Sequence, residues 1–333
     1  MPAKKQLAVT LSSLNGGCDE LIQQAVAAEQ AGYAAAWFSD TGYPDPLTLA
    51  GSVIAATHDI DIGIAVVPAS TRTPAVLASS TGTLHDLSKG RFILGLGTSS
   101  QTMIEKWHGQ DFNQPLARIR ETVCLIRSML AGEKSNFEGK VLRSKGFRIP
   151  AAQQPQRIYL AALRPKMLEL AAEIGDGVVL NLFPRKALPK IMEHIEIGAK
   201  RGGKTLSDIE VICRYQVAAG DDNSEELAMF RGFFGPYFAT PVYNQYLAWC
   251  GYPEIAEEIN AAWAAKDRER TFNAFSNEMV ESIAIVGSED ECQAIVRDQL
   301  DNGINTAMIT PASANADKRH SIINTFGIQQ FSL

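Results

Sequence analysis

The chain alternates between short apolar runs and segments in which apolar residues recur at helical spacing. Eight runs have the length and aliphatic content of buried β-strands, and they lie at Gln6–Leu11, Ala35–Ser39, Ile60–Val67, Arg91–Gly97, Ile158–Ala161, Val178–Asn181, Ile209–Ala218 and Thr306–Thr310. Helical spacing predicts helices between them, at Asp19–Gln30, Pro46–Ala56, Pro74–Asp86, Leu116–Leu130, Pro165–Ile174, Pro184–Arg201 and Glu289–Asn302, with a last helix closing the chain. This alternation is typical of α/β proteins.

Regular alternation of strand and helix implies parallel pairing, because two parallel neighbours need a crossover between them. Eight such units fit a closed (β/α)8 TIM barrel better than an open sheet, and no GxGxxG motif follows the first strand. We therefore expect residues 1–333 to form a single barrel domain, with insertions after strands 4 and 7 at residues 98–115 and 224–280. The second insertion is predicted to be helical throughout, and a hairpin is expected at Phe137–Ile149.

Composition and charge narrow the class of protein. The 333 residues are 46% apolar, enough for a large core, and the net charge of −6 argues against a nucleic-acid partner, which needs a basic face. The five cysteines are widely spaced without a CxxC pair, so we expect reduced and mostly buried thiols. No apolar run approaches the ~20 residues of a membrane span, and the N-terminal segment lacks the apolar core of a signal peptide. These features predict a cytoplasmic protein that acts on a small-molecule substrate, with no membrane partner.

Two strand ends carry residues suited to a bound ligand. The fourth strand ends in Gly95-Leu96-Gly97-Thr98, whose unhindered backbone can approach a planar ring or a phosphate, although these glycines can equally serve only the turn. The fifth strand ends in Ala161-Ala162-Leu163-Arg164-Pro165-Lys166, just before a helix. Free amides and the positive end of the helix dipole meet two cations there, which favours a phosphate site over a solvated helix end.

Single polar residues at other positions leave their roles open. Asp40 ends the second strand, where its carboxylate can orient a ring N–H or a substrate, or can cap the following loop. Arg72 can bind an anion or pair with a neighbouring acid, and we slightly favour the pairing. No HExxH or GxSxG motif is present and the five histidines lack metal-ligand spacing, so no metal site is predicted. Only His108 is expected near the barrel mouth, with the others on helices. If the chain itself does not supply the reactive group, a bound cofactor must do so.

The order of several motifs resembles the bacterial luciferase-like superfamily. They are Ser70-Thr71-Arg72-Thr73-Pro74-Ala75, Leu84-His85-Asp86-Leu87-Ser88-Lys89-Gly90-Arg91-Phe92, Gly95-Leu96-Gly97, Ala162-Leu163-Arg164-Pro165-Lys166-Met167 and Ile174-Gly175-Asp176-Gly177-Val178-Val179-Leu180-Asn181. The TRTP turn and the DGVVLN segment look more similar to the branch that uses the deazaflavin coenzyme F420 and includes methylenetetrahydromethanopterin reductase-like proteins. The resemblance covers most of the chain and is weakest over Ser224–Met279.

By this resemblance the chain is a (β/α)8 barrel that binds F420, or alternatively FMN, at the carboxyl ends of its strands. The resemblance implies that Ala65 and Val66 form a bulge, often with a cis peptide bond, that supports the deazaflavin ring. It also implies a homodimer. The ring would be faced by Asp40, Gly97 and Thr98, and the phosphate tail would lie among Ala162, Leu163, Arg164, Pro165, Lys166 and Asn181.

The resemblance does not extend to the reaction of every relative. Sugar-phosphate dehydrogenases of this branch carry an acid–base set at the positions of Thr41, Asp45 and Ser100, so sugar oxidation is not expected here. The resulting hypothesis is hydride transfer between F420 and an unidentified small organic substrate. Two rivals are an FMN-dependent monooxygenase of the same family and a barrel subunit without catalytic activity. Candidate substrate-facing residues are Thr41, Tyr43, Trp107 and His108.

Overall fold

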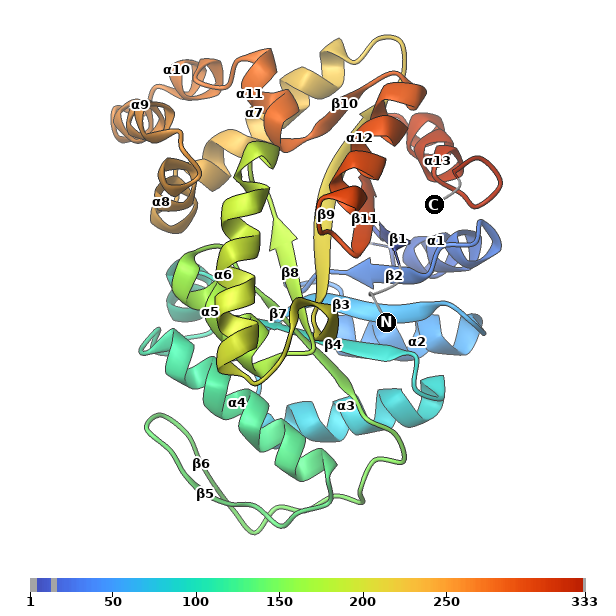
Figure 1. Ribbon diagram of the computed structural model, residues 1–333, viewed down its shortest axis with the longest axis vertical. Coiled ribbons are helices and arrows are strands. Elements are labelled where there is room, and N and C mark those ends of the chain that lie inside the picture. The colour runs from blue at the N-terminus through green and yellow to red at the C-terminus, as the bar shows by residue number, and fades with distance from the viewer. Residues whose placement is uncertain (1–4, 13–16, 332–333) are drawn as a thin grey trace.

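Among residues 5–12 and 17–331, which the computed structural model describes, eight parallel strands close into a barrel (Figure 1). Around the barrel the strands follow the order β1, β2, β3, β4, β7, β8, β9 and β11, which pairs again with β1. The predicted TIM-barrel fold is therefore confirmed. The strand bounds are β1 (Gln6–Thr10), β2 (Ala35–Phe38), β3 (Asp61–Pro68), β4 (Phe92–Gly97), β7 (Arg157–Ala161), β8 (Gly177–Asn181), β9 (Glu210–Ala219) and β11 (Thr306–Pro311).

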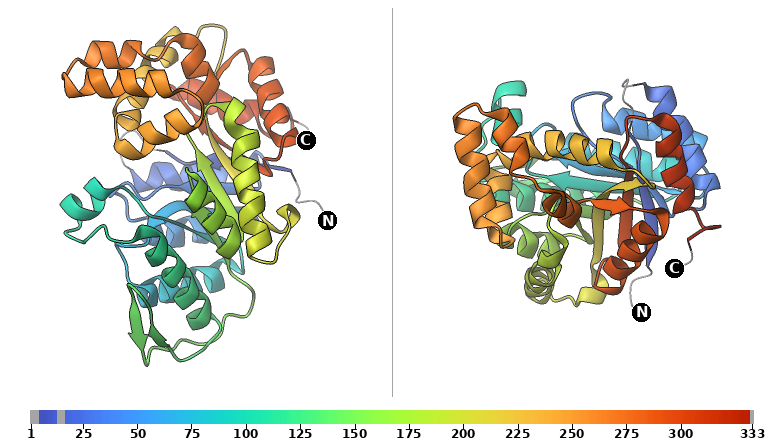
Figure 2. Two further views of the ribbon diagram at one scale, coloured as in Figure 1. Left: turned by 60° about the vertical axis from the view of Figure 1, so that its left-hand side comes forward. Right: turned by 90° about the horizontal axis from the view of Figure 1, so that it is seen from above.

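Helices alternate with these strands and surround the barrel (Figure 2). Prolines open several of them, because the first turn of a helix does not use the N–H that proline lacks. Two of these proline-initiated helices also have a side-chain cap at the same end: Asp45 caps α2 and Thr73 caps α3. The bounds are α1 (Cys18–Gln30), α2 (Pro46–Ala56), α3 (Pro74–Ser88), α4 (Pro115–Leu130), α5 (Pro165–Ile174), α6 (Leu188–Arg201), α12 (Glu289–Asp301) and α13 (Ala316–Thr325).

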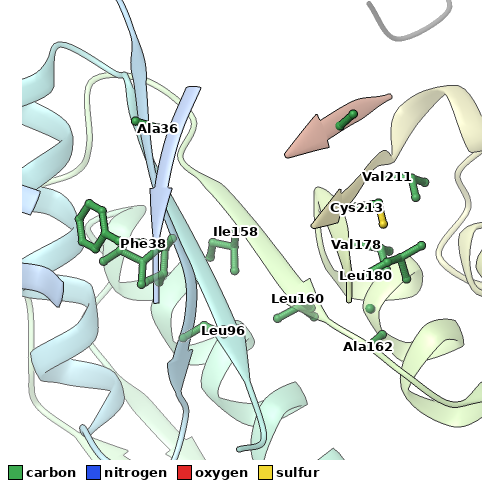
Figure 3. Close-up of a cluster of buried hydrophobic side chains, with 14 of the residues drawn as sticks. Ala36, Phe38, Leu96, Ile158, Leu160, Ala162, Val178, Leu180, Val211 and Cys213 are labelled. Atoms are coloured by element: carbon green, nitrogen blue, oxygen red, sulfur yellow. The ribbon is translucent and has the colours of Figure 1, made fainter. Parts of the chain in front are cut away.

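The main core lies between the outer face of the strands and the helices (Figure 3). Side chains alternate along a strand, so every second residue faces outward. On β7 and β8 the outward residues are Ile158, Leu160, Val178 and Leu180, all with no exposed surface. Each such burial contributes roughly 1.5–3 kcal/mol. The strands therefore read as nearly continuous apolar runs, since their inner faces are covered as well.

The inside of the barrel is closed by an apolar layer. Trp37 stacks on Tyr159 with ring centroids 5.9 Å apart. Gly63 leaves room for the indole, because a Cβ at this glycine would lie 2.3 Å from the Trp37 ring. This layer forms a floor beneath the carboxyl ends of the strands, which we call the barrel mouth. Its members are Ala8, Ala35, Trp37, Ile93, Tyr159, Val179, Ile212 and Met308.

The two expected insertions, residues 98–115 and 224–280, follow β4 and β9, and both views of Figure 2 show the turn at residues 103–107 on the same side of the molecule as the second insertion. The first contains a five-residue π-helical turn, η1 (Met103–Trp107). The second is helical, as predicted, and has its own core, which includes Phe230, Phe234, Phe238 and Phe275. Its helices are α7 (Ser224–Phe238), α8 (Pro241–Trp249), α9 (Pro253–Ala264), α10 (Arg268–Asn273) and α11 (Asn277–Ile283).

Some short elements escaped the sequence analysis. A strand, β10 (Ile285–Gly287), pairs in parallel with β9, and three residues are too few to show a two-residue period. Short 3-10 turns also precede α6 and β9, as η2 (Arg185–Ala187) and η3 (Leu206–Asp208). The predicted hairpin is present and consists of β5 (Asn136–Glu138) and β6 (Arg143–Lys145).

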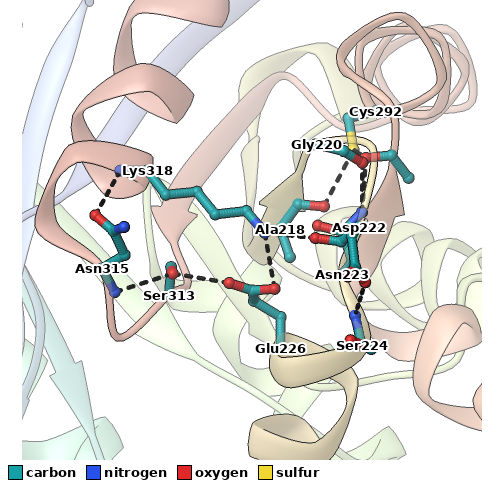
Figure 4. A network of polar contacts seen from close by, with 11 residues as sticks. Ala218, Gly220, Asp222, Asn223, Ser224, Glu226, Cys292, Ser313, Asn315 and Lys318 are labelled. Atoms are coloured by element: carbon teal, nitrogen blue, oxygen red, sulfur yellow. Dashed lines mark hydrogen bonds and ion pairs between the residues drawn. The ribbon is translucent and has the colours of Figure 1, made fainter.

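A polar network ties the second insertion to the last barrel unit (Figure 4). Glu226, near the start of α7, accepts hydrogen bonds from the Ser313 hydroxyl and the Lys318 ammonium, both at 2.8 Å. The Glu226 side chain is only 5% exposed. Burial raises the pKa of Glu226, but Lys318 and Ser313 outweigh that effect and lower the pKa below its ordinary value.

We expect Glu226→Ala to lower the free energy of unfolding by about 2–3 kcal/mol at neutral pH, because Lys318 would lose its carboxylate partner and keep only the Asp222 carbonyl oxygen. A carboxyl with a lowered pKa in the folded state stabilises the protein above its unfolded pKa. That contribution is lost as the pH falls below about 4.5 and through the lower folded pKa. Urea unfolding at pH 7 and pH 4 measures both effects.

The matched control is Glu225→Gln, which changes an exposed carboxylate on the same helical turn. It should change stability by no more than about 0.5 kcal/mol. Equal stability of Glu226→Ala and the wild type at pH 7 would show that the network does not hold the insertion.

Candidate active site at the barrel mouth

The third strand carries a bulge at the predicted position. The Ala65–Val66 peptide bond is cis, and the register between β3 and β4 shifts between Ile64 and Val67. The Ser39 hydroxyl donates to the Ala65 carbonyl oxygen at 3.0 Å. Ala65 packs against the apolar floor, so the bulge forms part of the inner wall of the mouth. The predicted cis bond is confirmed, while its contact with a ring stays a prediction.

The glycines of β4 are explained by this bulge. A Cβ at Gly95 would lie 1.9 Å from the Ile64 carbonyl oxygen, and one at Gly97 would lie 2.5 Å from a Val66 methyl group. Both glycines therefore make room for β3, whatever else the wall binds. Thr98 follows directly, and its hydroxyl donates to the Ser99 carbonyl oxygen at 3.2 Å.

Asp40 is held by an ion pair that sequence analysis left open. The Arg72 guanidinium contacts Asp40 at 2.8 Å and also pairs with Asp45. Asp45 in turn caps α2 by accepting from the Thr48 amide at 2.9 Å. Burial raises the pKa of Asp45, but Thr48 and Arg72 outweigh it and lower that pKa. Arg72 thus fixes the β2 exit loop, and Asp45 has a structural role in that loop.

The start of α5 fits the predicted phosphate site in part. Arg164 is exposed, and no side chain caps this helix, unlike α2 and α3. Its guanidinium contacts the side-chain oxygen of Gln245, on α8. Ala162 is buried and Leu163 packs against the main core, so these two offer only backbone, as does Pro165 at the first helical position.

Lys166 lies apart from Arg164. It lines a hollow of about 430 Å³ between α4 and α5, together with Glu169 and Glu173. This hollow lies on the outside of the barrel and is also lined by Arg120 and Arg201, which pair with Glu173 and Glu169, so the phosphate contact of Lys166 stays a prediction. Another hollow, of about 410 Å³, lies between α1 and α13 and is also lined by Thr10 and Pro311, the last residues of β1 and β11.

Asn181, at the end of β8, has an unused acceptor. Its Oδ1 atom is buried and forms no hydrogen bond with any described residue. The same side chain hydrogen-bonds with Tyr243 on α8. Buried polar atoms are rarely left unpaired, so Oδ1 is suited to a ligand hydroxyl or N–H. Beside it lies Arg214 on β9, which sequence analysis missed although it interrupts an apolar strand.

The candidate substrate-facing residues come from two loops. Tyr43, after β2, is 72% exposed, and Trp107, in the first insertion, is 61% exposed. Thr41 and His108 are exposed beside them in sequence. Free aromatic side chains next to a mouth suit a lid that closes over a ligand, but no contact with a ligand tests these assignments.

The prediction that all other histidines lie on helices is wrong for His58, which lies in the loop before β3.

Three further findings concern the described residues. No group of His, Cys, Asp and Glu among them is arranged to hold a metal ion. No helix within the described ranges has the length and apolarity required to span a membrane. The five cysteines are free, and Cys213, Cys250 and Cys292 are buried.

Known proteins share this architecture. The family model described as luciferase-like monooxygenase matches residues 4–306. A 5,10-methylenetetrahydromethanopterin reductase of Methanolobus tindarius is 29% identical over 300 residues, covering 89% of this chain and 91% of the relative. The structure of coenzyme F420-dependent tetrahydromethanopterin reductase from Methanopyrus kandleri superposes with a TM-score of 0.80 at 22% identity, covering 99% of this chain and 100% of that chain. The FMN complex of the oxygenating constituent of 3,6-diketocamphane monooxygenase from Pseudomonas putida superposes with a TM-score of 0.73 at 17% identity, covering 99% of both chains.

Proposed function

The chain belongs to the luciferase-like monooxygenase family, and on that premise we propose that it transfers hydride between coenzyme F420 and a small organic substrate. The observation that carries the proposal is the bulge at Ala65 and Val66, which lies on an inner wall of the mouth above an apolar floor. Such a wall suits a flat ring. The name of the Methanopyrus reductase, which includes coenzyme F420, favours F420 over FMN.

The described residues fit a cofactor of this kind. The orphaned Oδ1 of Asn181 can accept from a ribityl hydroxyl, and the uncapped start of α5 with Arg164 suits a phosphate. Arg164 is oriented by Gln245, so the second insertion helps to position it. The proposed ring contacts are Asp40, Ala65, Val66, Gly97 and Thr98.

The chain would contribute orientation and electrostatics. When bound, F420 supplies a carbon that gives or accepts a hydride. Arg72 keeps the Asp40 carboxylate fixed at the mouth, and the bulge fixes the plane on which a ring would lie. The insertions, with Tyr43 and Trp107 at the rim, would exclude water from the reacting carbon.

The first test is cofactor binding by the purified chain. We expect F420 to bind with a micromolar dissociation constant in a fluorescence titration, and FMN to bind more weakly. Tight retention of FMN without F420 binding would instead favour a flavin monooxygenase. Binding of neither cofactor would favour a barrel subunit without catalytic activity.

Arg164→Ala should weaken F420 binding by about 2 kcal/mol, or roughly 30-fold, if the guanidinium holds the phosphate through charge-assisted hydrogen bonds. Lys166→Ala is the matched control, because Lys166 lies in the hollow between α4 and α5. Its affinity for F420 should stay close to that of the wild type. Equal affinities of the Arg164 variant and the wild type would reject the phosphate assignment.

A further inference from the structure

Arg214 is a cation on the inner face of the barrel with no anionic partner. On β9 the outward residues are Val211, Cys213 and Tyr215, so Ile212 and Arg214 face inward. Ile212 belongs to the apolar floor, which places Arg214 directly above it. The Arg214 side chain is partly buried.

Its hydrogen bonds leave most of the guanidinium free. The Nε atom donates to the Thr310 hydroxyl at 3.1 Å, and Thr310 donates to the Thr10 hydroxyl at 2.9 Å. Within the described part of the chain, the two terminal nitrogens have no hydrogen-bond acceptor, and no carboxylate lies within ion-pair distance. These two nitrogens form the fork that binds an oxyanion through parallel N–H bonds.

Neighbouring side chains do not neutralise this charge. Burial lowers the pKa of Arg214, whereas Tyr237 and Tyr243 act in the opposite direction, yet a guanidinium remains protonated in proteins. Burial raises the pKa of Tyr243 to about 12, so its hydroxyl is neutral at physiological pH. Unpaired charges out of water are unfavourable, so this position is suited to an anionic ligand.

The position of β9 indicates which ligand. Around the closed barrel, β9 lies four strands from β3 in either direction, so Arg214 is on the wall opposite the Ala65–Val66 bulge. Tyr237 and Tyr243, whose rings are 5.4 Å apart, come from the second insertion and interact electrostatically with Arg214. A molecule held here would lie across the mouth from the bulge, between an apolar floor and aromatic side chains.

We propose that Arg214 binds a carboxylate of the substrate, so that the substrate of this chain is a small organic acid. The inference rests on the proposed function in placing the cofactor ring on the β3 wall. The carboxylate anchors the acid at β9, and its remaining carbon skeleton extends toward β3. Neutral molecules of the same shape lack the carboxylate that Arg214 binds, so the β9 wall favours anionic substrates over neutral ones.

The experiment uses benzoate as a planar carboxylate probe and benzamide as its neutral counterpart, with calorimetric titration of the full chain free of cofactor. Benzoate should bind the wild type more tightly than benzamide does. Arg214→Met should weaken benzoate binding by about 10- to 100-fold and leave F420 binding within twofold. Arg214→Lys, which keeps the charge but loses the fork, should be intermediate.

A stability measurement separates this role from a structural one. Arg214→Met should raise the thermal midpoint of the anion-free chain, because it replaces an unpaired charge by an apolar side chain. Arg268→Met, which removes an exposed cation stacked on Trp263, is the control for general charge effects and should bind benzoate like the wild type.

Three results would overturn the proposal: equal binding of benzoate and benzamide, unchanged benzoate binding by Arg214→Met, or an equal loss of F420 binding in that variant. The last would assign Arg214 to the cofactor. Absence of F420 binding in the wild type would reject the proposed function, and the benzoate titrations would then decide the role of Arg214 alone.

Discussion

Replacing Gly95 with alanine is expected to lower the free energy of unfolding by at least about 3 kcal/mol. The added Cβ would lie 1.9 Å from the Ile64 carbonyl oxygen and 3.1 Å from the carbonyl carbon, and backbone atoms cannot rotate away as a flexible side chain can. Either β3 or β4 must move, in a region where both strands are closely packed. Urea unfolding gives the loss directly, and F420 titration shows whether the displaced bulge still supports the ring.

Gly232→Ala is the matched control, because no atom lies within 4 Å of the Cβ position at this glycine in α7. Alanine is the better helix former, so this variant should be more stable by about 0.5–1 kcal/mol. Wild-type stability and F420 affinity in Gly95→Ala would show that the bulge tolerates movement and does not define the wall.

Much of the architecture was predictable because it follows from local periodicity. Strands such as Val178–Asn181 are apolar on both faces, since one face meets the helices and the other fills the barrel. Eight such runs separated by helices leave few alternatives to a parallel barrel. The cis bond at Ala65–Val66 is different, because nothing in the two side chains specifies it. That expectation came from the resemblance alone.

Contacts between distant segments were not predictable in the same way. Asp40 and Arg72 are 32 positions apart, and their pairing depends on how the exits of β2 and β3 approach each other. Lys166 was grouped with Arg164 because they are close in sequence, yet Arg164 precedes α5 and contacts Gln245, whereas Lys166 lies in the first turn and lines the hollow beside α4. The interior position of Arg214 could have been predicted once the strand bounds were set, because residues two apart on a strand, such as Ile212 and Arg214, face the same side.

These pairings explain why the candidate site was only partly found. Sequence analysis locates residues at strand ends, and strand ends converge in any barrel. It does not show whether a charge there is already neutralised by another loop. Arg72 pairs with two carboxylates, whereas Arg214 pairs with none. The amino-acid sequence alone does not distinguish these two arginines.

Arg72→Ala is the second change with a large expected effect. It removes the shared partner of Asp40 and Asp45, and the Asp40 side chain is only 13% exposed. An unpaired carboxylate in that position should lower the free energy of unfolding by about 3 kcal/mol. The β2 exit loop, with Thr41 and Tyr43, would lose its tie to α3. F420 affinity should therefore fall by roughly tenfold, about 1.4 kcal/mol, if Asp40 faces the ring.

Two further variants identify the cause. Arg72→Lys keeps the charge but cannot hold both carboxylates through one planar fork, so its stability should lie between those of the wild type and Arg72→Ala. Adding Asp40→Asn to Arg72→Ala removes the unpaired charge and should recover part of the lost stability but not the F420 affinity. Recovery of both stability and F420 affinity would mean that the unpaired Asp40 charge impairs only folding and that the Asp40 carboxylate does not contact the ring. Unchanged stability in Arg72→Ala would mean that the β2 exit loop is held by other contacts.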